Sequence, residues 1–368
     1  MTAQEAYIIL NMVPNIGPVR VRALLEAFGS PEAILAGKRN DLLGVENIGR
    51  EAADSVLNWR QHADLDAELK RIEKCGAHVV TRDEAGYPKH LRQIYDPPLV
   101  LYVRGTLGEG DPHAVAVVGS RRTTLYGQEM ARKLAYQLAR SGVTVVSGLA
   151  RGIDTAAHKG AMQAKGRTVA VLGCGVDQAY PPENKELAEE IIAKGGAVVS
   201  EFPCGTNPDR QSFPMRNRVV SGWSLGVVVV EASLTSGAMI TANFAAEQGR
   251  QVFAVPGRVD QPSSRGCHKL IKEGAKLTED FEDVLSEFET LLPQKVAETA
   301  TATGPALKLS ENEEKVFTAI GDEEVPVDEI IRSSGLTSAC VSATLLGLEM
   351  KRVVRQLPGK VFVRNTSS

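Results

Sequence analysis

The sequence lacks any run of about 18 apolar residues, the length that a membrane-spanning helix needs. It also begins, MTAQEAYIILNMVPNIG, with acidic and polar side chains where a secretory signal peptide carries a basic flank. Neither export nor membrane insertion is therefore indicated. We expect a cytoplasmic protein that has no membrane partner.

Cysteine is scarce, and no two cysteines form a Cys-x-x-Cys pair. Five widely scattered cysteines are present: Cys75, Cys174, Cys204, Cys267 and Cys340. An odd number at such spacing favours a reducing compartment and argues against structural zinc. We expect free thiols and no bound metal.

An overall excess of positive charge is also missing, because the net charge is −3. A binding site responds to local charge, however, and not to the sum over the chain. Between Gly119 and Arg167 nine Lys and Arg side chains stand against two acids, a local charge of +7. This segment is therefore a candidate for binding an anionic ligand.

The first part of the chain has helical periodicity from about Gln4 to Asn58, interrupted by the similar segments VPNIG (13–17) and VENIG (45–49). Each segment would join two short helices. The pair resembles helix-hairpin-helix motifs, which contact DNA phosphates without reading sequence. A small helical domain with Gly C-caps is an equally good interpretation. We expect a helical domain over residues 1–75.

From Ala114 the pattern changes to short buried runs that alternate with amphipathic helices. The runs are VAVVGS, VTVVSG, RTVAVLGCG, AVVSE, LGVVVVEA and QVFAVPG. This alternation predicts an α/β domain over residues 76–290, with a Rossmann-like, doubly wound, mainly parallel sheet. In such sheets the ligand lies beyond the carboxyl ends of the strands.

After Phe288 the small, polar stretch PQKVAETATATGPALK predicts a flexible linker over residues 291–308. Three helical segments and two strand segments, RVVRQL and KVFVR, follow it, with Pro358-Gly359 between the strands. They predict a winged-helix domain over residues 309–368. Its third helix is poor in Arg and Lys, which argues against DNA reading by that helix.

The turn after the first predicted parallel strand reads Gly119-Ser120-Arg121-Arg122-Thr-Thr. A strand-to-helix turn presents free N–H groups to an anion, and Arg121 adds a bidentate phosphate donor. The dinucleotide fingerprint needs Gly at the third place of the turn and an acid closing the next strand. Here the third place is Arg121 and the next strand closes with Ser147-Gly148, so we expect no dinucleotide cofactor.

The second turn, SGLARGID, places Ser147 and Gly148 at the same edge, and we include both among the candidate binding residues. Asp154 is best interpreted as a helix-capping residue. His158 lies at i+4 from Asp154, a spacing that suits a weak metal or acid–base pair. Without a third ligand, a structural hydrogen bond is the better interpretation.

The long turn after the fourth strand gathers an aromatic side chain and several cations. Its candidate binding residues are Arg210, Phe213, Arg216, Asn217 and Arg218. Bases stack on aromatic rings and phosphates attract arginines, so this mixture suits a groove for single-stranded nucleic acid. In the alternative interpretation Phe213 belongs to the core and the arginines form structural ion pairs. The shared sheet edge with Arg121 favours binding.

The turn after the fifth strand adds Ser236, Gly237 and Thr241, whose hydroxyl and N–H groups suit phosphate. Cys174 and Glu201 are possible catalysts, but a lone Cys or Glu is more often structural. We therefore expect a binding protein and not an enzyme. The alternative is a Rossmann-like nucleotide-processing hydrolase, because Gly-, Ser- and Thr-rich turns also hold mononucleotides.

Seven motifs, in this order, resemble the bacterial DNA-processing protein A family, DprA, also called Smf. They are VVGSRRTTLYG, SGLARGIDTAAH, VLGCGVDQAYPPEN, SEFP, FPMRNRVVSG, VVVVEASLTSGAMITA and VFAVPG, and the similarity runs from about Tyr87 to Leu277. Seven ordered motifs make a chance similarity very improbable. The helical first domain and the winged helix also fit this family.

The resemblance implies a homodimer that binds and protects single-stranded DNA, helps to load the RecA recombinase during natural transformation, and has no catalytic activity. It implies that Gly119, Ser120 and Arg121 form the phosphate-binding turn and that Phe213 contacts a base. Two positions depart from the family pattern. Arg210 stands where a Lys is common, and His268 stands where Asn is usual.

Overall fold

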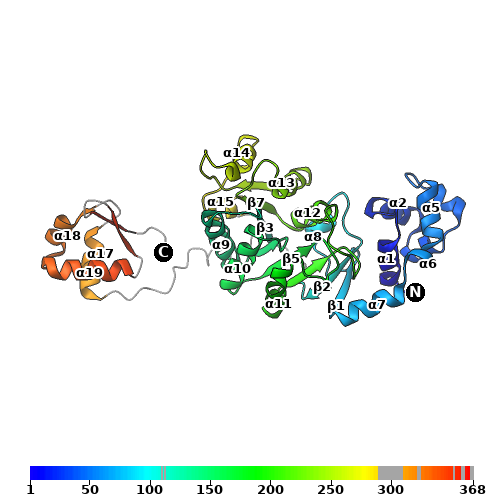
Figure 1. The fold of residues 1–368 in the computed structure, drawn as a ribbon, viewed down its shortest axis with the longest axis horizontal. Coiled ribbons are helices and arrows are strands. Elements are labelled where there is room, and N and C mark those ends of the chain that lie inside the picture. Colours follow the sequence, from blue (N-terminus) through cyan, green and yellow to red (C-terminus); the bar gives the residue numbers. More distant parts are fainter. Residues whose placement is uncertain are drawn as a thin grey trace. The chain divides into compact units, whose positions relative to one another are not determined.

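The structure is a computed structural model that describes residues 1–108, 111, 113–288, 310–320, 325–350, 353–357 and 361–364. The chain divides into two compact units, Met1–Val296 and Ala297–Ser368, which are described separately (Figure 1). The predicted linker 291–308 and the predicted turn at Pro358-Gly359 lie outside the described residues. Within the described ranges, no helix has both the length and the apolar character that crossing a membrane requires.

The first unit begins with a group of short helices. They are α1 (Ala3–Met12), α2 (Pro18–Phe28), α3 (Pro31–Leu35), α4 (Arg39–Leu43), α5 (Arg50–Leu57), α6 (Trp59–His62) and α7 (Leu65–Lys74). Gly17 and Gly49 are the N-caps of α2 and α5, so neither glycine is a C-cap. Arg20 ties the two turns together, because its side chain donates to the carbonyl oxygens of Asn15 and Asn47. The two similar segments therefore build a pair of linked helical hairpins.

Nine strands in the described part of the unit form one sheet, in the order β1-β2-β6-β5-β4-β3-β7-β8-β9. Their bounds are β1 (Ala77–Thr81), β2 (Val100–Gly105), β3 (Ala114–Gly119), β4 (Thr144–Ser147), β5 (Thr168–Leu172), β6 (Ala197–Ser200), β7 (Gly226–Val230), β8 (Gln251–Ala254) and β9 (Lys276–Leu277). All neighbours from β6 to β9 are parallel, and β1 and β2 join antiparallel. The predicted mainly parallel sheet is confirmed.

Helices cover both faces of this sheet, because successive strand residues point to opposite sides. On β3, Val115 and Val117 pack with α9 (Leu125–Arg140) and α10 (Ile153–Gln163), whereas Ala116 and Val118 pack on the side of α12 (Ser212–Trp223) and α13 (Gly237–Glu247). The remaining helical elements are α8 (Lys89–Arg92), η1 (Pro182–Asn184), α11 (Lys185–Ala193), η2 (Pro262–Ser264), α14 (Arg265–Lys272) and α15 (Phe281–Leu285). The sheet is therefore doubly wound, as predicted.

The order of the strands in the sheet determines where a ligand can bind. From β3 the chain runs outward through β4, β5 and β6, and α12 then returns it to β7 on the opposite side of β3. Strand order therefore reverses between β3 and β7. The turns that follow these two strands diverge, and the crevice between them is the standard ligand position of doubly wound sheets.

The second unit contains α17 (Glu311–Ile320), α18 (Val327–Ser334) and α19 (Ser338–Met350). Its three-stranded antiparallel sheet has the order β10-β12-β11, with bounds Val325–Pro326, Val361–Arg364 and Val354–Leu357. Val316, Ile330, Leu345 and Phe362 belong to a separate buried core. These elements confirm the predicted winged helix, to which β10 adds a short third strand.

Candidate nucleic-acid interface

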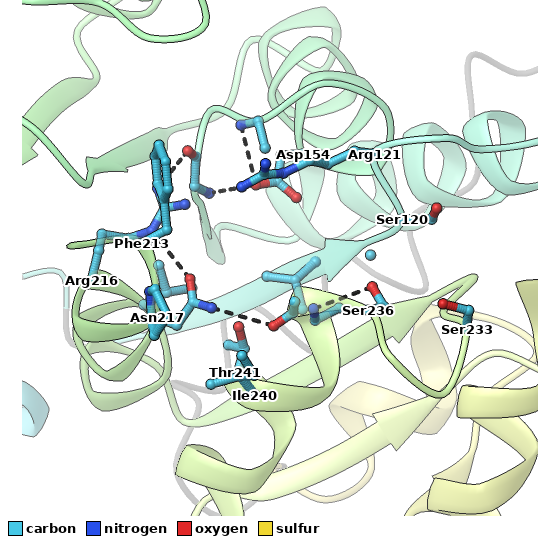
Figure 2. A pocket seen from close by; sticks show the side chains of 18 of the residues that line it. Ser120, Arg121, Asp154, Phe213, Arg216, Asn217, Ser233, Ser236, Ile240 and Thr241 are labelled. Atoms are coloured by element: carbon cyan, nitrogen blue, oxygen red, sulfur yellow. Dashed lines mark hydrogen bonds between the residues drawn. The ribbon is translucent and has the colours of Figure 1, made fainter. Parts of the chain in front are cut away.

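A hollow of about 760 Å³ opens at the carboxyl ends of β3 and β7, and we call it the strand-end hollow (Figure 2). It lies at the reversal of strand order described above. Twelve of the fourteen predicted binding residues line it, namely Gly119, Ser120, Arg121, Arg122, Gly148, Arg210, Phe213, Arg216, Asn217, Ser236, Gly237 and Thr241. Ser147 and Arg218 do not.

A buried carboxylate holds the turn after β3 in place. Glu231, directly after β7, accepts hydrogen bonds through Oε2 from the Thr124 backbone N–H at 2.9 Å and from the Thr123 hydroxyl. The Ser120 N–H donates to the Glu231 carbonyl oxygen at 2.8 Å. With its backbone fixed in this way, the turn leaves the side chains of Arg121 and Arg122 exposed at the rim of the hollow.

Arg121 and Phe213 meet across the mouth of the hollow (Figure 2). The Arg121 guanidinium carbon lies 5.2 Å from the centroid of the Phe213 ring. On another side the Tyr180 ring packs against Phe213, with centroids 5.4 Å apart. A Cβ on Gly173 would stand 2.8 Å from the Phe213 ring, so only glycine fits there. The half-buried ring is therefore held in position with one part facing the hollow.

Arg216 lies at the base of the hollow and is almost fully buried. Its Nη1 donates to the carbonyl oxygens of Gly148 and Val171, and its Nε donates to Asn217 Oδ1 at 3.3 Å. Among the described residues Nη2 has no hydrogen-bond partner. Burial lowers the pKa of Arg216, and the nearby Asp154 carboxylate opposes this effect. Arg216 therefore holds the backbone at the base of the hollow in place and makes the electrostatic potential there more positive.

Arg218 requires a correction of the sequence-based prediction. Two residues along an α-helix differ by about 200° in direction, so Arg218 points away from the side that Arg216 faces. It is 5% exposed and pairs with Glu201 through Nη2 and with Asp96 through Nε, at 3.1 Å for the latter. The alternative interpretation, a structural ion pair, is correct for this arginine.

Ser147 requires the same correction. It is the last residue of β4 and is fully buried. Its hydroxyl donates to the Val117 carbonyl oxygen at 2.7 Å, inside the sheet. This hydrogen bond occupies the hydroxyl, so the side chain has a structural role.

The side chains considered as metal ligands or catalysts, Asp154, His158 and Cys174, are buried among other residues. The Asp154 carboxylate accepts from the N–H groups of Gly148 and Ala150, and His158 Nδ1 lies 2.7 Å from Thr168 Oγ1. Burial raises the pKa of Cys174 to about 11, which disfavours the thiolate. In the part of the chain that the structure describes, no group of three or more His, Cys, Asp or Glu side chains is placed to hold a metal.

Among the lining residues that the sequence analysis did not name, three carry an aromatic ring or a hydroxyl group: Tyr180, Ser233 and Ser263. Tyr180 follows β5 in the segment VLGCGVDQAYPP. Because β5 ends at the same sheet edge as β3, an aromatic residue shortly after it could have been included. Ser263 comes from the loop after β8, and its position depends on how that loop folds back.

The comparisons with known proteins agree with this architecture. The family model described as DNA recombination-mediator protein A matches residues 78–289, which is more than half of the chain. The chain belongs to this family. Models of the DprA winged helix domain and of a SAM-like helix-hairpin-helix tandem match residues 300–360 and 7–58. The family resemblance inferred from the seven motifs is therefore confirmed.

One relative matches almost the whole chain, and two solved structures match large parts of it. Protein Smf from Synechocystis sp. is 33% identical, over 98% of this chain and 99% of its own length. The crystal structure of DNA processing protein A (DprA) from Streptococcus pneumoniae is 37% identical, with a TM-score of 0.67, and covers 78% of this chain and 98% of that one. The Helicobacter pylori DprA structure, described by its single-stranded DNA binding mode, is 30% identical, with a TM-score of 0.52 and coverages of 59% and 98%.

Proposed function

We propose that this member of the DNA recombination-mediator protein A family binds single-stranded DNA in the strand-end hollow. The observation that carries the proposal is the contact between Arg121 and Phe213. It brings a phosphate-binding cation and a base-stacking ring together at a strand-to-helix turn. Single-strand binding needs both elements, because phosphates supply charge and unpaired bases expose their faces.

The lining of the hollow supports this assignment. Arg121, Arg122 and Arg210 are exposed cations at its edge, and Arg216 adds positive potential at its base. Gly237 begins α13 with Ser236 as N-cap, so N–H groups and hydroxyls are at hand for phosphate oxygens. The Helicobacter pylori relative is described by its single-stranded DNA binding mode, which names the same ligand.

An electrophoretic mobility shift with the full-length protein tests the proposal. Single- and double-stranded DNA of equal length and composition are compared at several salt concentrations. We expect the single strand to bind more tightly, because only unpaired bases can stack on Phe213. Equal binding of both forms, or binding unaffected by Arg121→Ala, would reject the hollow as the site.

We also propose a role downstream of binding, which rests on the family. By resemblance, the protein acts as a homodimer that protects incoming single strands and helps to load RecA in transformation or recombination. The winged helix is an accessory to this activity, since α19 contains no Lys or Arg. Nuclease protection and RecA strand-exchange assays, with and without the protein, test these two steps.

We propose that the bound strand is not chemically altered. The two residues considered as catalysts have structural partners: Glu201 pairs with Arg218, and Cys174 donates to the Gln178 carbonyl oxygen at 3.0 Å. ATP, NAD and single-stranded DNA should therefore stay intact on incubation. Turnover that Glu201→Ala or Glu231→Ala abolishes would favour a nucleotide-processing hydrolase instead.

A further inference from the structure

A second hollow, of about 570 Å³, lies beside the strand-end hollow, and we call it the Tyr126 hollow. Tyr126, Pro256 and Glu231 line it, together with Thr124 and Ser263. Ser263 also lines the strand-end hollow, and the turn after β3 contributes Arg122 to that hollow and Thr124 to this one. The two hollows are therefore neighbours on either side of the turn that we propose as a phosphate contact.

We propose that the Tyr126 hollow binds a further nucleobase of the same strand, and that Glu231 favours a base that carries an amino group. This inference rests on the proposed function. A strand whose phosphate sits on the Arg121–Arg122 turn carries bases on both sides of it. One of them faces Phe213, and the Tyr126 hollow lies where the other can go.

The wall of this hollow suits the face of a base. Tyr126 is 49% exposed, yet its ring is held in place, because its hydroxyl donates to the Pro256 carbonyl oxygen at 2.8 Å. A fixed, exposed aromatic ring beside a phosphate site is the usual stacking platform for an unpaired base. The pyrrolidine ring of Pro256 adds apolar surface from the neighbouring loop.

The charges of this hollow argue against a second phosphate. Among the residues that the structure describes, Arg258 is the one cation that lines it. Arg258 already pairs with Asp260 through both Nε and Nη2, at 3.0 and 2.8 Å. Glu231 contributes a negative charge. A phosphate would therefore be repelled here, whereas a neutral base would not.

Glu231 gives the hollow its selectivity. Its Oε2 accepts the hydrogen bonds of Thr123 and Thr124, and Oε1 accepts none from the described residues. A carboxylate oxygen only accepts hydrogen bonds, so it matches the amino group of cytosine, adenine or guanine. Thymine offers only its ring N3–H, which lies between two carbonyl oxygens that a carboxylate repels, and would be disfavoured.

Fluorescence anisotropy of the full-length protein with labelled (dC) and (dT) oligonucleotides of equal length tests the proposal. Tyr126→Ala should weaken binding to both by between about 5-fold and 150-fold, the range for losing one stacked base. Tyr126→Phe keeps the ring and should retain most of the affinity. The matched control is Tyr95→Ala, because Tyr95 is 71% exposed and lines neither hollow.

Glu231→Gln tests the selectivity. The amide oxygen can still accept from Thr123 and Thr124, which turns the amide N–H₂ group toward the hollow as a donor. The ratio of (dC) affinity to (dT) affinity should then fall by about 2-fold to 10-fold, the worth of one hydrogen bond. An unchanged ratio in a folded variant would overturn the selectivity.

The outcomes separate the two proposals. If Arg121→Ala weakens binding but Tyr126→Ala binds like the parent protein, the second base site is wrong and the proposed function stands. If the parent binds neither oligonucleotide, both are wrong. Should Glu231→Gln fail to fold, the comparison of Tyr126→Ala with Tyr126→Phe still decides whether the ring is a stacking surface.

Discussion

The guanidinium group of Arg121 lies over the ring of Phe213, at 5.2 Å from carbon to centroid. One residue comes from the turn after β3 and the other from α12, so only the folded sheet brings them together. A cation beside a ring matches the alternation of phosphate and base along a single strand. The two contacts respond differently to salt, which allows each to be tested separately.

Arg121→Ala should weaken binding to any sequence, because a phosphate contact carries no base information. Suppose that Arg121, Arg122 and Arg210 each neutralise one phosphate. A plot of the logarithm of the affinity against the logarithm of the salt concentration should then have a slope of about −2, at roughly −0.7 per contact. The parent protein then loses about 18-fold between 50 and 200 mM salt. In the variant the slope should flatten by about 0.7.

The control for this measurement is Arg121→Lys, which keeps the charge and should keep most of the slope. Salt titrations of both variants by anisotropy give the comparison. Equal flattening by Lys and by Ala would mean that the phosphate contact requires the geometry of the guanidinium group and not its charge alone.

Phe213→Ala should give the opposite signature. Losing a stacking surface should cost about 1–3 kcal/mol of binding free energy and leave the salt slope nearly unchanged, because no counterion is involved. Phe213→Trp keeps a stacking ring and serves as the matched control. A changed slope in Phe213→Ala would show that the variant also displaces Arg121.

The sequence predicts the sheet and its ligand edge because buried runs and polar turns leave a direct pattern. The run VAVVGS becomes β3, and its turn lines the hollow as expected. The pattern does not mark β1 and β2, which lie outside the repeating strand-helix order and join the sheet antiparallel. Their pairing depends on contacts between distant segments, which local periodicity does not encode.

The sequence indicates which residues lie at the carboxyl-end edge of the sheet, but not the direction in which each side chain points. Arg216 and Arg218 both lie on α12, which follows β6, but helical geometry directs only Arg216 toward the hollow. The position of Tyr180 after β5 indicates the sheet edge, but its contact with Phe213 depends on how two distant segments fold together. The ordered motifs identified the family, whereas the partner of each arginine required the three-dimensional structure.

Arg218→Met should destabilise the fold without acting on the strand-end hollow. It leaves the carboxylate of Glu201 buried without its cation, and such a change costs about 3–5 kcal/mol. The double variant Arg218→Met/Glu201→Gln removes the unpaired charge and should recover much of this loss. Urea unfolding of the two variants gives the comparison, and the salt slope of any folded variant should equal that of the parent. A flatter slope would mean that Arg218 contacts DNA.

His158 should make the sheet sensitive to mild acid. Burial lowers its pKa to about 3, whereas in the unfolded chain the pKa is about 6.5. Below pH 6.5 the unfolded chain therefore takes up a proton that the folded protein does not, and stability falls as the pH falls. From pH 7 to pH 5 this single group should remove about 2 kcal/mol of unfolding free energy.

His158→Gln should remove this contribution while keeping a polar partner for Thr168. The chain has two tryptophans, and Trp223 is fully buried in α12. Its fluorescence in a Trp59→Phe background reports on unfolding of the sheet domain. The free energy of unfolding is measured at pH 7 and at pH 5, with His158 present and in the His158→Gln variant. The loss of stability between the two pH values is then compared. A difference near zero would mean that another group carries the acid sensitivity.

Removing the second unit should leave single-strand binding intact, because every residue proposed to contact DNA lies in the first unit. A chain of residues 1–290 keeps Phe288, whose ring packs edge-on against Phe253 with centroids 5.8 Å apart. Its affinity for a single strand should stay within about 2-fold of the parent, since an accessory domain changes no phosphate contact.

A chain of residues 1–286 is the matched control. It loses the buried Phe288 ring and should be less stable by about 3–5 kcal/mol. If the longer chain folds but has lost most of its affinity, the site lies in the winged helix and not in the strand-end hollow.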